Sequence, residues 1–218
     1  QRFIADVRRW GIVRAIYRAV MQMLRPWFCL CRVNVRPLDG SVGPNERFEE
    51  RLATREELLA AAKEMPNVLD EEFVNAALAR GDICIAVFDG GQIVSFGWRA
   101  YGPAPHTEGL WVDFNKPARY GYKAYTRPEY RGMHIRDPRR RDDLCLARGV
   151  KIAIGFVESH NYPSIQSATR TGNNRVGYAG YIKLGARIWP FRTPGAARYG
   201  FRFFRPDAKN DNSGPTAH

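Results

Sequence analysis

Apolar residues recur with a helical period over the first part of the chain. Between residues 3 and 24 they return every three or four positions, which places them on one face of an amphipathic helix. Arg14 and Arg18 fall on another face. Pro26 is expected to end the helix, because the residue before a proline avoids helical backbone angles. The apolar positions are Phe3, Val7, Trp10, Val13, Tyr17, Val20 and Leu24.

The middle of the chain predicts strands and helices in mixed order. Thr54 followed by Glu57 has the pattern of a capping box and predicts the start of a helix. A second helix is expected from Asp70 to Gly81. Two apolar runs, 83–88 and 93–98, flank a pair of glycines and predict a β-hairpin. The other expected elements are strands at 31–38, 119–127, 151–157, 176–184 and 198–204, a basic loop and helix over 131–148, and a helix at 161–171.

These elements predict a mixed α/β (α+β) fold, in which the first strands pair as an antiparallel hairpin and later strands are joined by helices. A chain of 218 residues, 44% of them hydrophobic, is long enough to bury about 70% of its unfolded surface in one domain. We expect residues 1–30 to form an N-terminal helical segment, 31–206 a single domain, and 207–218 a disordered tail.

The charge balance limits the classes of partner without choosing one. Thirty-four basic residues against 22 acidic ones give a net charge of +12, so the field of the molecule attracts polyanions. Nucleic acid, anionic lipid, cofactor phosphates and an acidic carrier protein all stay open. The N-terminal helix either docks on its own domain or makes a peripheral membrane contact through residues 1–25. The arginine-rich and aromatic segment 186–205 is interpreted as a strand pair with a basic face, so a nucleic-acid partner is not expected.

The cysteines and the lack of a long apolar run indicate a cellular location. Cys84 and Cys145 lie in apolar surroundings, as buried thiols do. Cys29 and Cys31 have no nearby metal-ligand pair, so no metal site is expected. No apolar run approaches the ~20 residues that a membrane span needs. We therefore expect a cytoplasmic protein, at most peripheral at the inner membrane surface.

The segment from Tyr125 to Arg136, YTRPEYRGMHIR, is the first candidate for chemistry. A strand stops at a proline, and a turn containing Gly132 leads toward the expected helix. A helix N-terminus presents free N–H groups and binds phosphate without a side chain. Arg131 and Arg136 add charge around that turn. This pattern predicts an anion site at the turn.

Two stretches resemble the GNAT acyltransferase superfamily, and the likeness runs from about residue 31 to 204. TRPEYRGMHI resembles the pyrophosphate loop of that family, and ESHNYPSIQSATRTG is similar to its later Asn-x-x-Ser helix. The resemblance implies a mixed central sheet with antiparallel N-terminal strands and a splayed parallel pair, flanked by helices. It also implies an acyl-CoA or acyl-carrier-protein (acyl-ACP) donor, direct transfer of an acetyl or longer group to an amine-bearing small molecule, and no metal.

By the same resemblance, particular residues of this chain hold the donor. The residues of the strand would line the pantetheine arm, those of the turn would hold the pyrophosphate, and two residues of the later helix would contact the arm from the other side. In that order they are Tyr125, Thr126 and Arg127; Arg131, Gly132, Met133, His134, Ile135 and Arg136; and Asn161 with Ser164.

The chain departs from the family pattern at the turn and at the general acid. His134 and Arg136 stand where the family has small residues, and Ala168 stands where it often has a tyrosine. An amine must lose a proton as it attacks, so a base is needed. The catalytic candidates are Glu158 as base, with His160 and Asp113 behind it, and Tyr162 or His160 as the acid that protonates the thiolate. The alternative is a catalytically silent relative that binds nucleic acid or an anionic membrane through its basic surface.

Overall fold

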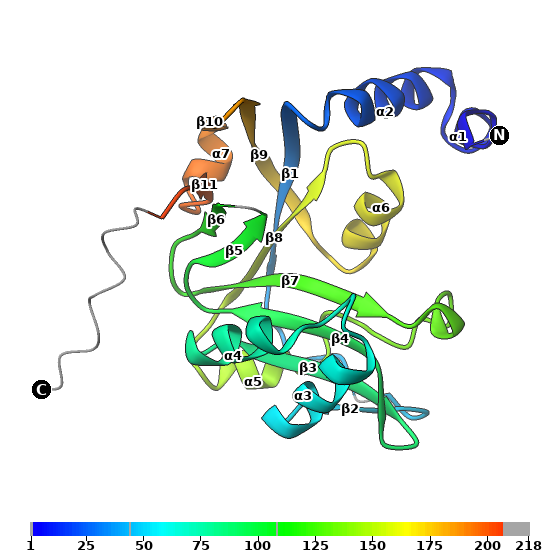
Figure 1. Cartoon of the computed structure of the whole chain (residues 1–218), viewed down its shortest axis with the longest axis vertical. Helices are drawn as coiled ribbons and strands as arrows, with labels where there is room; N and C mark the ends of the chain where they lie inside the picture. The colour runs from blue at the N-terminus through cyan, green and yellow to red at the C-terminus, as the bar shows by residue number, and fades with distance from the viewer. Residues whose placement is uncertain (1, 44, 108, 207–218) are drawn as a thin grey trace, which may run out of the picture.

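The computed structural model describes residues 2–206 apart from 44 and 108. The predicted tail at 207–218 lies outside the described residues. The chain forms one large mixed sheet, a smaller sheet and several short helices (Figure 1). The helices are α1 (Arg2–Trp10), α2 (Ile12–Leu24), α3 (Arg55–Glu64), α4 (Glu71–Ala79), α5 (Asp142–Leu146), α6 (Tyr162–Arg170) and α7 (Pro194–Ala197), with a 3-10 turn at Pro128–Tyr130.

The strands confirm the expected α/β class with a GNAT-like central sheet. Eight strands follow the order β10-β9-β1-β8-β7-β4-β3-β2, and β11-β6-β5 form a second sheet. Within the large sheet β7 and β8 are parallel, and the other neighbours are antiparallel. The strands are β1 (Phe28–Pro37), β2 (Glu49–Leu52), β3 (Ile83–Asp89), β4 (Gln92–Ala100), β5 (Ala104–Thr107), β6 (Leu110–Asp113), β7 (Ala118–Thr126), β8 (Ile152–Glu158), β9 (Asn174–Leu184), β10 (Arg187–Arg192) and β11 (Arg202–Phe204).

Several local predictions are confirmed by the backbone. Thr54 and Glu57 form the capping box that begins α3. The Asp70 side chain accepts a hydrogen bond from Phe73 N and begins α4. β3 and β4 form the predicted hairpin. The sequence pattern did not predict β2, β5 or β6, because strands of four residues carry too little periodicity.

Other predictions are wrong in their boundaries. The first helix breaks in two at Gly11, whose φ of 84° leaves the helical region. Of the strand expected at 198–204, only Arg202–Phe204 is a strand, β11, and residues 198–200 form a turn after the short α7. The helix expected within 131–148 is reduced to the five residues of α5.

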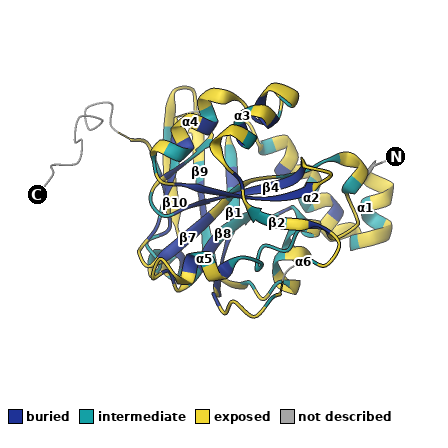
Figure 2. Ribbon diagram, turned by 90° about the horizontal axis from the view of Figure 1, so that it is seen from below, coloured by how far each residue is buried: buried dark blue, intermediate teal, exposed yellow. Residues whose placement is uncertain are grey.

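The core lies on both faces of the large sheet. One apolar cluster joins α3 and α4 to β3 and β4, with Phe96 and Trp98 fully buried in it. On the same face, a second cluster joins the small sheet and α7 to β1, β7 and β8, around Phe201 and Phe203. On the opposite face, a smaller cluster joins Cys145 of α5 to Ala153 of β8. The buried strands at the centre and the exposed outer faces of the helices are visible in Figure 2. The middle strands β7 and β8 are therefore held from both sides.

Candidate functional site

The two parallel strands in the middle of the large sheet separate soon after they begin. β7 and β8 pair over three residues, ending at Tyr120 opposite Ile154. Beyond that point β7 stays with β4 as far as Thr126, and β8 stays with β1 as far as Glu158. The strands therefore diverge toward their carboxyl ends and leave a wedge-shaped gap. Their facing backbone edges do not pair with each other there, like those of edge strands.

A β-bulge in β7 accompanies this divergence. Phe96 of β4 pairs with Tyr125, but Trp98, two residues on, pairs with Tyr122, three residues back. β7 thus holds one extra residue, and Lys123 within the bulge has a φ of 42°. A bulge bends its strand and increases its twist. The bulge thus lies where β7 departs from β8.

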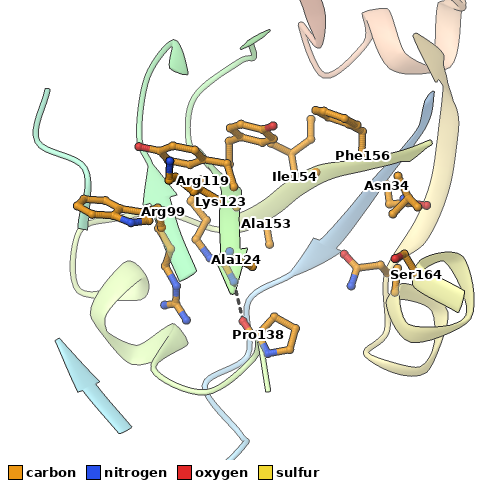
Figure 3. Close-up of a pocket in the computed structure, with 18 of the residues that line it drawn as sticks. Asn34, Arg99, Arg119, Lys123, Ala124, Pro138, Ala153, Ile154, Phe156 and Ser164 are labelled. Atoms are coloured by element: carbon orange, nitrogen blue, oxygen red, sulfur yellow. Dashed lines mark hydrogen bonds between the residues drawn. The ribbon is translucent and has the colours of Figure 1, made fainter. Parts of the chain in front are cut away.

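A cavity of about 760 Å³ passes through the gap from one face of the sheet to the other (Figure 3). Neighbours such as Arg119 and Tyr120 both line it, although successive residues of a strand point to opposite faces. Figure 3 shows Asn34 and Ser164 across the cavity from Arg99. These three residues lie on one face of the sheet, and the residues that line the cavity on the other face are chemically different.

The side covered by α5 and α6 is cationic. Its lining holds four arginines, and among the described residues no carboxylate lines the cavity. Burial, and next the nearby Arg99, lowers the pKa of Arg119 to about 10. The same two causes lower the pKa of Arg136. Mutual repulsion of this kind favours binding of an anion. The cations are Arg36, Arg99, Arg119 and Arg136, whereas Lys123 Nζ lies on the other side of the sheet, 4.0 Å from the centroid of the Phe73 ring.

One buried carboxylate neutralises part of this charge from behind the lining. The Asp142 side chain is fully buried, and its oxygens lie 2.7 Å from Arg36 Nη1 and 2.9 Å from Arg119 Nη2. Within residues 2–206, 44 and 108 aside, Arg36 Nη2 and Arg119 Nε are buried without a hydrogen-bond partner. Over the same residues, Arg136 makes no hydrogen bond or ion pair. The Arg136 guanidinium therefore remains free for a ligand, whereas the two buried donors of Arg36 and Arg119 have no accessible surface.

Three glycines on adjacent strands form the floor of the cationic side. A Cβ added to Gly155 of β8 would meet no atom within 4 Å, and one added to Gly121 of β7 would meet only Arg119 Nη1, at 3.6 Å. At Gly97 of β4 the place of a Cβ is filled by the Arg136 guanidinium. The absence of side chains keeps the floor open and lets Arg136 lie flat on the sheet.

The opposite side of the cavity is aromatic. The rings of Tyr120 and Tyr122 stack at 5.8 Å, and those of Tyr120 and Phe156 at 6.0 Å. Trp98 continues the surface onto β4. The Tyr122 hydroxyl donates to buried Asp82 at 2.6 Å. Burial and this bond raise the pKa of Tyr122, so its hydroxyl stays protonated and fixed in place.

His106 of β5 connects this aromatic side to a second cavity. It lines both the main cavity and a smaller one of about 340 Å³, which is also lined by Cys29, Glu158 and Tyr181. Its ring lies edge-on to Phe156 at 5.0 Å. Burial lowers the pKa of His106, against a smaller opposing effect of Glu158. The imidazole is therefore neutral near pH 7 and able to accept a proton.

Only two of the predicted donor-binding residues, Arg136 and Ser164, line the cavity. Asn161 lies next to Ser164 but caps α6, because its Oδ1 accepts a hydrogen bond from Ser164 N at 3.3 Å. The Asn161 side chain is thus already used within its own helix. Ser167 and Thr171, one and two turns further along, complete the α6 wall.

The residues predicted to line the arm pack toward β4 instead. Ser95 Oγ donates to Tyr125 O and lies 2.8 Å from Thr126 Oγ1. Arg127 donates to Ile93 O at 2.8 Å and pairs with Glu64 at 2.7 Å. Their bonds hold the hairpin to the end of β7. The three preceding residues of β7, Tyr122, Lys123 and Ala124, line the cavity in their place.

The predicted phosphate turn does not lead into a helix, and this expectation is wrong. A 3-10 turn and further turns follow β7, and α5 begins only at Asp142. Ile135 is buried against the β3–β4 hairpin, so the segment folds back onto the sheet. Arg131 bonds to Thr126 O, and Gly132, Met133 and His134 are exposed away from the cavity lining. The positive charge on the cationic side of the cavity comes from arginine side chains and not from a helix N-terminus at this turn.

The predicted catalytic residues lie near the second cavity or beyond it. Glu158 lines that cavity and is 3.4 Å from His160 Nε2 and 3.8 Å from Arg25. Burial lowers the pKa of His160, as it does for His106. The Tyr162 hydroxyl donates to a backbone carbonyl of α2 at 3.3 Å. Of these three residues, only Glu158 lines a cavity.

Asp113 also lies away from the gap, because its carboxylate accepts from the Arg202 guanidinium at 2.8 Å across the small sheet. The residues that sequence reasoning missed are His106, Lys123 and the arginines on the strands. Arg99 and Arg119 interrupt apolar strand patterns, and a charge expected to be buried in a strand is the signal that could have identified them.

Comparison with known proteins gives a structural likeness alone. No family model matches the chain, and no curated protein matches its sequence. A solved structure described as a GNAT-family acetyltransferase, from Novosphingobium aromaticivorans, covers 70% of this chain at 14% identity and a TM-score of 0.48. A GNAT-family acetyltransferase from Colwellia psychrerythraea covers 80% of this chain at 12% identity, with a TM-score of 0.48. A GCN5-related N-acetyltransferase-like protein from Streptococcus suis covers 76% of this chain at 16% identity, with a TM-score of 0.42.

The matched parts span 62%, 61% and 66% of those three chains. Identities this low say nothing about which residues act. The GNAT-like character of the fold rests on the chain's own strand order, on its diverging parallel pair and on the bulge in β7.

Proposed function

We propose that this protein transfers an acyl group from a thioester donor to an amine, with the donor's arm in the gap between β7 and β8. The observation that carries the proposal is the divergence of these two central strands around a cavity that crosses the sheet. An extended arm with amide groups can pair with both open strand edges. The thioester would then lie between the cationic and the aromatic side.

The cationic side suits the anionic end of the donor. Arg136 lies on the glycine floor without a protein partner among the described residues, and Arg99 and Arg119 line the same side. Both acyl-CoA and acyl-ACP carry phosphate at that end of the arm. Arginine binds phosphate through paired N–H groups. The acyl group and the amine acceptor would face the aromatic side.

His106 is the base that this geometry favours. The amine nitrogen attacks the thioester carbon, the carbon–sulfur bond breaks, and the amine loses a proton. A neutral imidazole accepts that proton and returns it to the departing thiolate, so atoms and charge balance. Backbone N–H groups at the β7 bulge that point into the gap would stabilise the oxyanion.

Donor binding is tested first by melting temperature. Acetyl-CoA or an acyl-ACP should raise it by mass action, because a ligand that binds only the folded state stabilises that state. Arg136→Gln should weaken binding of coenzyme A about tenfold or more and leave pantetheine, which lacks the phosphates, unchanged. If no acyl-CoA or acyl-ACP shifts the melting temperature, the proposal is wrong.

Turnover is tested separately with a panel of small amines. His106→Gln should lower kcat about a hundredfold or more without changing the affinity for coenzyme A. The result that separates an enzyme from a catalytically silent relative is binding without turnover. Donor binding with no amine acylated under any condition would favour the silent alternative.

A further inference from the structure

Large apolar side chains are exposed mainly at one end of the molecule. Twelve of the fifteen that are exposed among the described residues lie in 3–27 or 182–191. Figure 1 places the corresponding elements, α1, α2, β9, β10 and the start of β1, along its upper edge. We call this surface the apolar end. Its exposed apolar residues are Phe3, Ile4, Ile12, Val13, Ile16, Val20, Met23, Trp27, Ile182, Leu184, Trp189 and Phe191.

The helical part of the apolar end presents a continuous stripe to the outside. Ile12, Ile16, Val20 and Met23 recur every three or four residues on α2, so they lie on one face. Ile12 is 60% and Met23 67% exposed. The other face of α2 is docked on the domain, where the Tyr17 hydroxyl lies 2.7 Å from Ser159 Oγ. The stripe is therefore fixed in an outward orientation.

The strand part of the apolar end is the outer face of the β9–β10 hairpin. Ile182 pairs with Trp189 across the two strands, which puts both side chains on one face. Trp189 is 45% exposed, and β10 is the last strand of the sheet. Trp27 joins the hairpin to α2, since its carbonyl accepts from Lys183 N at 2.7 Å. Helix stripe and hairpin thus form neighbouring parts of one surface.

The charges at the apolar end are almost entirely positive. Residues 3–27 contain five arginines and one acid, Asp6, which is bonded to Arg18 at 2.7 Å. The neighbouring Glu158 lies 3.8 Å from Arg25. Residues 182–191 contain two basic residues, Lys183 and Arg187, and no acid. Arg8, Arg9, Arg25, Lys183 and Arg187 are exposed there. A second copy of the chain would bring the same positive charge to the contact, and nucleic acid would leave the apolar side chains in water.

We propose that the apolar end binds the surface of a membrane that contains anionic lipid. Aliphatic side chains would enter the interface, Trp27 and Trp189 would lie at headgroup level, and the arginines would meet the lipid phosphates. No helix in the described part of the chain is long and apolar enough to cross a membrane, so the contact would be interfacial. This proposal does not depend on the proposed acyl transfer.

The test is cosedimentation of the full chain with vesicles of phosphatidylcholine alone or mixed with phosphatidylglycerol. Binding should require phosphatidylglycerol and weaken as salt is raised. Ile16→Glu and Trp189→Glu should each lower the partition coefficient about tenfold or more, because each puts a charge on the apolar surface. Arg8→Gln should lower it about fivefold.

Leu52→Glu is the matched control, because Leu52 is an exposed apolar residue of β2 at the far edge of the sheet. Its binding should equal that of the wild type, and circular dichroism should show all variants folded. Three outcomes overturn the proposal: no binding to either vesicle, equal loss in the Leu52→Glu variant, or a stable dimer by light scattering that Ile16→Glu dissolves without any vesicle binding.

Discussion

Burial lowers the pKa of His106 and of His160, so both imidazoles are neutral near pH 7. Their pKa values lie below the ordinary value of 6.5. Below that pH the unfolded chain binds protons that the folded chain does not. The free energy of unfolding should therefore fall as pH decreases through the window below 6.5.

The contribution of His106 is isolated by comparing the wild type with His106→Gln. Urea unfolding from about pH 7.5 down to about pH 5 should show a smaller loss of stability in the variant, because glutamine does not titrate. The slope with denaturant should be the same for both proteins. Equal loss in wild type and variant would show that His106 titrates alike in the folded and unfolded chain.

The sequence identified some of the residues that line the cavity but not how the candidate residues are arranged around it. The sequence drew attention to Arg136 and Ser164 because both belong to distinctive stretches, and both line the cavity. It could not show that Tyr162 lies beneath α2, since that contact joins residues 148 positions apart. His106 stands alone in an irregular stretch, so no local pattern marked it. Its position depends on how the small sheet packs.

At the scale of elements, Gly155 offers a way to close the gap without disturbing the fold. Its φ is not positive, and an added Cβ would meet no atom within 4 Å. Gly155→Ala should raise the free energy of unfolding by about 0.4–1 kcal/mol by restricting the unfolded chain. Gly155→Leu should fill the cavity floor and weaken coenzyme A binding about tenfold or more, measured by calorimetry.

Gly102→Leu is the control, because a Cβ there also meets no atom within 4 Å and Gly102 does not line the cavity. Coenzyme A should bind this variant as it binds the wild type. A Gly155→Leu protein that is folded and keeps wild-type affinity would mean that the ligand does not occupy the gap.

The element pattern was predictable where local periodicity decides structure. Thr54 with Glu57 and the glycine pair between β3 and β4 carry their own turn and cap chemistry, and both predictions are confirmed. The segment 131–148 has helix-forming residues, yet only Asp142–Leu146 is helical. Burial of Ile135 and the bonds of Arg99 to the carbonyls of residues 140 and 141 hold it in turns. Tertiary contacts override propensity here.

For the whole molecule, Asp142 is the carboxylate that joins distant parts of the chain. It connects α5 to Arg36 on β1 and Arg119 on β7, with all three side chains buried. Asp142→Asn should lower the free energy of unfolding by about 3 kcal/mol, because two buried guanidinium groups lose their counter-charge. Urea unfolding with an unchanged slope is the measurement. A loss below about 1 kcal/mol would show that the cavity already hydrates these arginines.

The net charge of +12 was evident from composition, but the places where the cations gather on the molecule were not. The structure gathers cations in two separate places, inside the central cavity and on the outer apolar end. The net charge alone did not choose between cofactor phosphates and anionic lipid as partners. Separation in space allows both contacts at once, each with its own arginines.

The early separation of β7 and β8 has a consequence for exchange of backbone hydrogen with deuterium. Amides in the middle of an eight-stranded sheet ordinarily exchange only when the sheet opens. Those of β7 and β8 that point into the wedge have no strand opposite them beyond Tyr120 and Ile154. Although they lie in the middle of the sheet, these amides should exchange as quickly as those of an edge strand. Their exchange should slow down when an extended molecule binds between β7 and β8.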